Sequence, residues 1–152
     1  MISQTAEYAL RAMVHLAATS REQPPQTVEQ IAAGTRVPAG YLAKVLQGLA
    51  RAGLVTSQRG IGGGFRLSKP PEETTIYEVV QAVDPIRRIY HCPLGLPAHG
   101  TNLCPLHRRL DEAMEAIEAQ FRATTLAQLL EEPTTGSASE EKPCAFPIAV
   151  SK

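Results

Sequence analysis

Two cysteines in the second half of the chain have surroundings typical of metal ligands. Cys92 and Cys104 are separated by eleven residues of a loop rich in proline and glycine, and His107 completes a C-x-x-H motif. His91 and His99 lie in the same stretch. Thiolates gathered in a loop are typical ligands of iron–sulfur clusters. A C-x-x-H pair also suits zinc, and two neighbouring thiols can form a reversible disulfide. These residues are therefore compatible with an iron–sulfur cluster, a zinc site or a disulfide.

The contents of apolar and charged residues are typical of a folded globular protein, but the charges are distributed unevenly along the chain. No apolar run approaches the ~20 residues that a membrane span needs, and the N-terminus lacks the pattern of a secretion signal. We therefore expect a cytoplasmic protein that does not bind membranes, in which cysteines are normally reduced. Residues 1–71 carry eight lysines and arginines against three acidic residues, a net charge of +5, and residues 72–152 carry −5. The basic N-terminal half suits a polyanionic partner.

The spacing of apolar residues predicts a mainly helical protein with one hairpin. Thr27 and Gln30 form a capping box at the start of a short helix, and Gly34 is expected to end it. Pro38 starts the next helix, and a glycine-rich tip follows between two short strands. The predicted elements are helices over 5–18, 27–34, 38–53, 75–83 and 105–122, a helical turn at 125–130, and strands over 54–57 and 65–67.

Two helices joined by a tight turn and followed by a glycine hairpin are typical of a winged helix-turn-helix that binds DNA. The helix that starts at Pro38 would enter the major groove by its N-terminal end, where small side chains allow close approach. Arg59, at the tip of the hairpin, would enter the adjacent minor groove, whose negative potential favours a guanidinium. The candidate DNA contacts are Thr27, Ala39, Gly40, Tyr41, Lys44, Gln47, Arg51, Arg59 and Gly62.

Two other classes of function are compatible with parts of the chain. A three-helix unit with a hairpin can be a protein-interaction module, whose binding would not depend on salt, whereas phosphate contacts weaken steeply as salt rises. An enzyme is the other class. Residues 60–64 are rich in glycine but lie between two strands, which does not fit a phosphate-binding loop, and no nucleophile–base signature is present. We therefore expect no enzymatic activity, and the order of the elements favours DNA binding.

Three stretches resemble the winged-helix, BadM-like transcriptional regulators typified by IscR, NsrR and CymR. They are 7–13 (EYALRAM), 37–47 (VPAGYLAKVLQ) and 52–67 (AGLVTSQRGIGGGFRL). The resemblance implies a homodimer that pairs through the long helix, binds double-stranded DNA at a near-palindromic operator and usually represses transcription. The expected parts are a winged helix-turn-helix DNA-binding domain (1–83), a cysteine-containing sensor loop (84–104), a dimerisation helix (105–131) and a disordered tail (132–152).

Many members of that family hold an iron–sulfur cluster that tunes DNA binding, and the resemblance implies one here, 2Fe–2S in preference to 4Fe–4S. The signal sensed would be redox state, nitric oxide or iron supply. Similar members usually have three cysteines in this loop, whereas this chain has Ala98 at the middle position. Some members complete the site with a side chain from the first helix of the other subunit, and Glu7 matches by position. The implied ligands are Cys92, Cys104, Glu7 of the partner subunit, and His107 or His99.

Each ligand also has a structural alternative. Glu7 and Arg11 are four residues apart on one helix and can form an ion pair on its surface. His107 can form a hydrogen bond with the backbone of the loop. His15 is expected to be an ordinary surface residue, and Cys144 in the tail is not expected to be a ligand. Without a cluster, the two loop cysteines would form a thiol switch or part of a zinc site.

Overall fold

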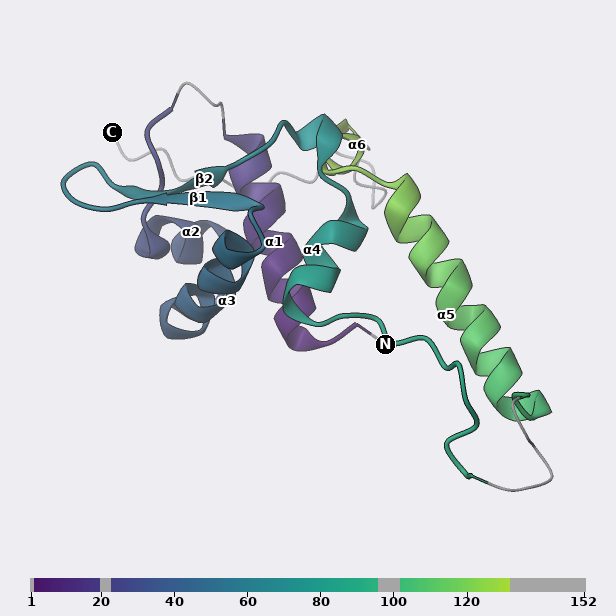
Figure 1. The fold of residues 1–152 in the computed structure, drawn as a ribbon. Coiled ribbons are helices and arrows are strands. Elements are labelled where there is room, and N and C mark those ends of the chain that lie inside the picture. Colours follow the sequence, from purple (N-terminus) through teal and green to yellow (C-terminus); the bar gives the residue numbers. More distant parts are fainter. Residues whose placement is uncertain (1, 20–22, 96–101, 132–152) are drawn as a thin grey trace, which may run out of the picture.

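Helix α1 (Gln4–Ala18) is the element around which the rest of the chain is arranged. The structure is a computed structural model that describes residues 2–19, 23–95 and 102–131, so the tail expected at 132–152 lies outside the described residues. Figure 1 shows α1 near the centre, with α2, α3 and the hairpin on one side and α4 and the long α5 on the other. The elements after α1 are α2 (Val28–Thr35), α3 (Ala39–Arg51), β1 (Val55–Gln58), β2 (Gly64–Leu67), the 3-10 turn η1 (Pro71–Glu73), α4 (Ile76–Val83), α5 (Pro105–Ala123) and α6 (Leu126–Glu131). The predicted mainly helical fold, a winged helix-turn-helix with a long C-terminal helix, is confirmed.

Helix α1 starts at a serine cap and buries a face in which three alanines lie beside larger side chains. The Ser3 hydroxyl accepts a hydrogen bond from the Ala6 amide (3.2 Å), and this cap starts the helix at Gln4, one residue earlier than predicted. Ala9 and Ala12 are fully buried. Because alanine projects only a methyl group, neighbouring helices can approach closely, and α2, α3, α4 and α6 all contact α1.

The turn between α2 and α3 differs from its predicted form, because Gly34 lies inside α2. The helix continues to Thr35 and ends at Arg36, which has left-handed backbone geometry (φ 56°). A β-carbon at Gly34 would lie 2.2 Å from Cε1 of His15. The prediction that Gly34 ends the helix is therefore wrong, and its role is to let α1 and α2 approach each other.

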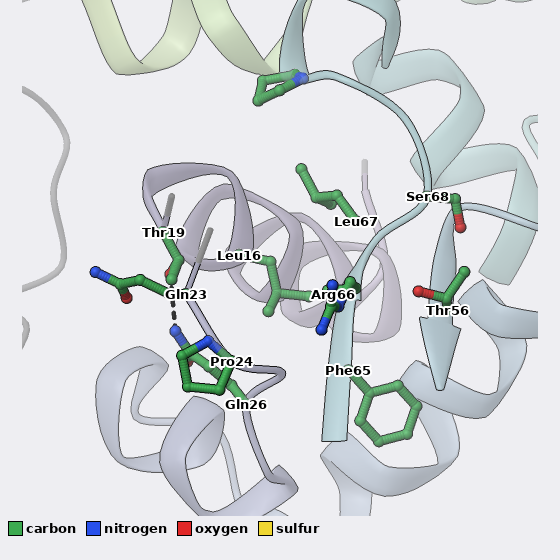
Figure 2. A pocket seen from close by; sticks show the side chains of 11 residues that line it. Leu16, Thr19, Gln23, Pro24, Gln26, Thr56, Phe65, Arg66, Leu67 and Ser68 are labelled. Atoms are coloured by element: carbon green, nitrogen blue, oxygen red, sulfur yellow. Dashed lines mark hydrogen bonds between the residues drawn. The ribbon is translucent and has the colours of Figure 1, made fainter. Parts of the chain in front are cut away.

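His15 is buried, in contrast to its predicted place on the surface. It is only 4% exposed, and its Nε2 lies 2.7 Å from the side-chain oxygen of Gln26. The Gln26 amide donates to the Thr19 hydroxyl (2.7 Å; Figure 2), which in turn donates to the His15 carbonyl oxygen (3.0 Å). Hydrogen bonds of this kind are what allow a polar side chain to be buried, and a histidine is therefore stable here.

The hairpin is held against the loop that precedes α2. Its two strands are antiparallel, with Val55 opposite Leu67. Gln26 exchanges two backbone hydrogen bonds with Phe65 (2.9 and 2.7 Å). A β-carbon at Gly64 would lie 2.4 Å from the Gln26 carbonyl oxygen, so the glycine permits this close pairing. The base of the wing is thereby fixed to the helix-turn-helix.

The segment after α4 leaves the body of the protein, and α5 runs back to it and leads into α6 (Figure 1). No residue of α5 is buried, whereas Leu126 at the start of α6 is fully buried. The junction pairs with the start of α4, because the Leu126 amide donates to the Thr74 carbonyl oxygen (2.9 Å) and the Ile76 amide to that of Thr124 (3.0 Å). None of the helices within the described ranges has both the length and the apolar character of a membrane span.

Gly34→Ala is expected to lower the free energy of unfolding by about 1–3 kcal/mol, the usual cost of overpacking a filled site. The added methyl group would meet the His15 ring. Gly48→Ala is the matched control, because a β-carbon there lies no closer than 3.7 Å to Val83 and alanine favours a helix over glycine. Urea denaturation of both variants measures the difference. Equal changes in stability would contradict the assigned role of Gly34.

Candidate DNA-binding surface and metal centre

Helix α3 has one buried face and one exposed face. The buried face is made of Leu42, Val45, Leu46 and Leu49, as the periodicity predicts. The positions predicted to contact DNA are all exposed, and they lie on α3, at the start of α2 and in the hairpin: Thr27, Ala39, Gly40, Tyr41, Lys44, Gln47, Arg51, Arg59 and Gly62. The fold therefore leaves each of these positions accessible to a large ligand.

Tyr41, in the first turn of α3, is tied to α1. Its hydroxyl lies 2.6 Å from the hydroxyl of Thr5, and its ring meets the Tyr8 ring edge-on with centroids 5.4 Å apart. Thr5 and Tyr8 could not be predicted from the sequence, because Thr5 lies 36 positions from Tyr41 and no local pattern connects them. These contacts set the position of the start of α3 relative to α1.

A groove lies between α3 and the hairpin. Gln47 and Arg51 line it from α3, and Gln58, Arg59 and Phe65 line it from the hairpin. The Arg51 guanidinium lies along the helix, because its Nε donates to the Gln47 carbonyl oxygen (3.3 Å). Two guanidinium groups and two amides beside an open groove match the sugar–phosphate backbone of DNA, which proteins bind through charge and through hydrogen bonds to phosphate oxygens.

Two sulfur atoms and one imidazole nitrogen meet at the start of α5. Cys104 is the N-cap residue of this helix, and the first helical turn brings His107 back beside it. His107 Nδ1 lies 3.1 Å from Cys104 Sγ and 3.7 Å from Cys92 Sγ. The three donor atoms lie within 4.8 Å of one another, and the three residues are half-buried. The structure thus brings together three of the five predicted ligands.

The other predicted ligands do not join this group within the described part of the chain. Glu7 is exposed on α1 and forms an ion pair with Arg11, which was its alternative role. His99 lies outside the described residues, as do Ala98 in the loop and Cys144 in the tail. Sulfur and imidazole donors suit both zinc and iron. Zinc sites usually have four ligands, so this group is a partial set that needs a donor from elsewhere.

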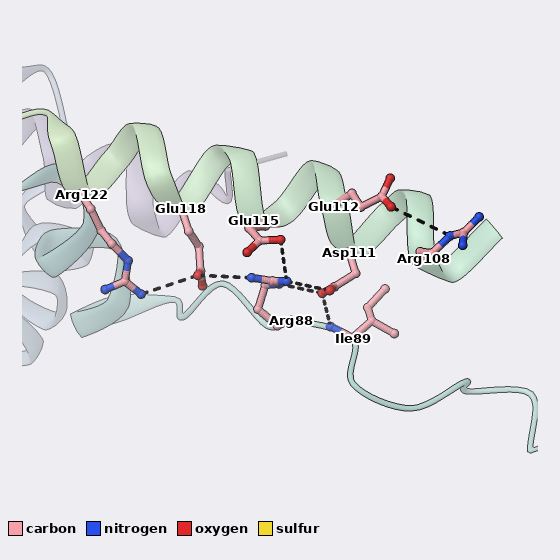
Figure 3. A network of polar contacts seen from close by, with 8 residues as sticks. All are labelled: Arg88, Ile89, Arg108, Asp111, Glu112, Glu115, Glu118 and Arg122. Carbon is pink, nitrogen blue, oxygen red and sulfur yellow. Dashed lines mark hydrogen bonds and ion pairs between the residues drawn. The ribbon is translucent and has the colours of Figure 1, made fainter. Parts of the chain in front are cut away.

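An ion pair fixes the segment before the first loop cysteine onto α5. Arg88 Nε and Nη2 each lie 2.7 Å from a carboxylate oxygen of Asp111, and the Ile89 amide donates to the same carboxylate (2.8 Å). Figure 3 shows Glu115 and Glu118, further along α5, beside the same guanidinium. The guanidinium and the amide lower the pKa of Asp111 to about 2, and the Asp111 carboxylate raises the pKa of Arg88 above its ordinary value.

The stability that comes from this ion pair should be lost in acid. Because the folded-state pKa of Asp111 is below its ordinary value of 3.8, the pair stabilises the fold above that pH and loses its contribution as the pH falls towards 2. Asp111→Asn should lower Tm at neutral pH, and the difference from wild type should shrink in this acidic range.

Thermal melts across pH measure this effect. Glu112→Gln is the control, because Glu112 is its exposed neighbour on α5 and pairs with Arg109 on the surface (3.0 Å). Exposed ion pairs contribute little to stability, so this control should change Tm only slightly at any pH. A Tm difference for Asp111→Asn that stays constant down to pH 2 would contradict the assignment.

The exposed cations of α3 and the hairpin should give DNA binding a measurable salt dependence. Lys44→Ala, Arg51→Ala and Arg59→Ala should each weaken binding, and each should reduce the slope of log affinity against log salt by about 0.9, the value for the loss of one cation that neutralises a phosphate charge. Arg109→Ala, on the exposed surface of α5, is the control and should leave the slope unchanged. Fluorescence anisotropy with a duplex selected from a random library measures the slopes, and four equal slopes would rule out this surface.

Comparison with known proteins assigns the family. The family model described as Rrf2, an iron-dependent transcriptional regulator, matches residues 2–132. The chain is 35% identical over 131 residues to the HTH-type transcriptional regulator NsrR of Geobacillus kaustophilus, covering 83% of this chain and 86% of that protein. The fold is similar to that of CymR, the global cysteine regulator of B. subtilis, with a TM-score of 0.69, 27% identity, and coverage of 85% of this chain and 95% of that chain.

A second solved structure supports the fold. IscR of T. potens has a TM-score of 0.70 at 23% identity, and 86% of each chain is covered. The predicted resemblance to this group of regulators is confirmed, and so is the prediction that the chain is not an enzyme, because its relatives are transcriptional regulators. This chain belongs to the Rrf2 family of transcriptional regulators, which bind DNA and are not enzymes.

Proposed function

We propose that the chain is a homodimeric repressor whose binding to a near-palindromic operator is controlled by an iron–sulfur cluster, 2Fe–2S rather than 4Fe–4S. The observation that carries this proposal is the group formed by Cys92, Cys104 and His107, whose donor atoms lie within 4.8 Å of one another. The family description, an iron-dependent regulator, supports the same reading. The protein would act in the cytoplasm.

Helix α5 supports the homodimer because its apolar stripe is exposed in the single chain. Leu106, Leu110 and Ile117 are 62%, 44% and 44% exposed, and their spacing places them on one face of the helix. Pairing with a second copy would remove this surface from water, and burial of apolar surface is the dominant favourable contribution to most protein association. A symmetric dimer also fits a near-palindromic operator, because each recognition helix reads one half-site.

The loop residues have the chemistry that a cluster needs. The two cysteines would bind as thiolates and His107 through Nδ1, which already faces both sulfur atoms. Glu7 of a second copy is the proposed fourth ligand, and it would have to leave its ion pair with Arg11. A bound cluster would supply a centre that responds to electrons, nitric oxide or iron supply, and its potential depends on its ligands and surroundings.

Helix α1 connects the proposed fourth ligand to the recognition helix. Glu7 lies between Thr5 and Tyr8 in the first turns of α1, and both neighbours contact Tyr41 in α3. Ligation of Glu7 would therefore hold α1, and with it the start of α3, in one position. A ligand shifts the equilibrium between two positions of α1 only when it binds them with different affinity. The cluster would favour the position in which Glu7 reaches it.

A cluster-free regulator is the second candidate, favoured by the short separation of the two sulfur atoms. Cys92 Sγ and Cys104 Sγ lie within 4.8 Å of each other, so a modest movement would bring them to the ~2.05 Å of a disulfide. Oxidation by a peroxide would remove two electrons and two protons from the thiols. Zinc, bound by both cysteines, His107 and one further donor, is the other cluster-free form.

Anaerobic reconstitution with iron and sulfide separates these forms. The wild-type protein should become coloured and contain about two iron and two sulfide ions per site. Cys104→Ala should abolish the visible absorption, and His107→Ala should shift or weaken it because an imidazole ligand is lost. His91→Ala is the matched control, because His91 is exposed and lies outside the group of three donors. A colourless wild-type protein without iron or sulfide would remove the cluster proposal.

A further inference from the structure

We infer that Ile61, at the tip of the hairpin, is a specificity-determining residue that contacts the DNA minor groove and favours A·T over G·C pairs there. This inference rests on the proposed function and on the predicted entry of the hairpin into that groove. The residue is 108% exposed, so none of its apolar surface contributes to the core. Single exposed apolar residues are common on protein surfaces, and the position of Ile61 is what gives it a role.

A tight turn holds Ile61 at the outermost corner of the hairpin. The Gly63 amide donates to the Gly60 carbonyl oxygen (3.0 Å), and Gly62 has a φ of 75°, as the third residue of a type II turn requires. A β-carbon at Gly63 would lie 2.3 Å from the Gln58 carbonyl oxygen, so only glycine lets the turn close this tightly. Ile61 occupies the second position of this turn, and its full exposure places its side chain in the solvent.

The turn lies where DNA would pass. Figure 1 shows the hairpin loop projecting beyond α2 and α3 on the side away from α5. Arg59, two residues before Ile61, lines the groove between the hairpin and α3 together with Arg51. A β-branched side chain has few rotamers, so ordering Ile61 against a ligand costs little conformational entropy. The tip therefore carries a cation, Arg59, and an apolar side chain with few rotamers, Ile61, separated by one glycine.

This pair of side chains matches the minor groove of A·T pairs. Both orientations of A·T present only acceptors there, whereas G·C adds the guanine amino group. The Arg59 guanidinium donates to the acceptors, and Ile61 packs against sugar C–H groups in the space that the amino group would need. A guanine at that place would leave its amino group covered by an apolar side chain and without a hydrogen-bond partner, which is costly.

Inosine substitution tests this directly, because an I·C pair lacks the amino group and so has the minor groove of A·T. The full-length protein is titrated against its duplex selected from a random library, with each flanking A·T pair replaced in turn by G·C or by I·C. At one or two positions wild type should lose about tenfold in affinity with G·C, the size of effect of one unfavourable base pair, and keep its affinity with I·C. Ile61→Ala should still bind but lose this discrimination.

Two variants act as controls. Ile61→Val keeps the β-branched shape and should keep the discrimination, and Thr56→Ala, an exposed change on strand β1, should leave it intact. Discrimination that survives Ile61→Ala, or equal losses with G·C and I·C at every position, would overturn the inference while leaving DNA binding intact. Absence of salt-sensitive binding to any selected duplex would instead overturn the proposed function, and this inference with it.

Discussion

Helix α1 buries Ala6, Ala9 and Ala12 on the side where other helices pack. These small side chains pack into the core together with the larger Met13 and Leu16, and α2, α3, α4 and α6 all contact this one helix. The approach of α2 to α1 depends on Gly34, because the ring of His15 fills the space that a side chain at this position would occupy. The recognition helix therefore has its position set by α1, and any displacement of α1 would be passed on to α3.

In the proposed dimer, the same helix would connect the two candidate functional regions. Its first turns carry Thr5 and Tyr8 against Tyr41, and they also carry Glu7, the proposed ligand from a second copy. At the other end of the molecule, the ion pair between Arg88 and Asp111 holds the approach to the cysteine loop on α5. The candidate DNA-binding surface is thus attached to α1, and the sulfur donors are attached to the start of α5.

Features set by local spacing were predictable, and features set by distant contacts were not. The capping box at Thr27 and the buried stripe of α3 depend on residues three or four apart, and both are present. The meeting of Cys104 and His107 likewise follows from one helical turn. The burial of His15, the ion pair of Arg88 and the Tyr41 contacts join segments that fold together from far apart in the chain. No periodicity or motif encodes such pairs.

The most direct test of the link between the cysteine group and DNA is the operator affinity of one anaerobic preparation, measured with its cluster present and again after chelation has removed it. If the group formed by Cys92, Cys104 and His107 controls DNA binding, the two affinities should differ by roughly 5–150-fold, the usual range of coupling between two sites. Cys104→Ala should show a single affinity under both treatments. Equal wild-type affinities with and without the cluster would contradict the proposed control of DNA binding.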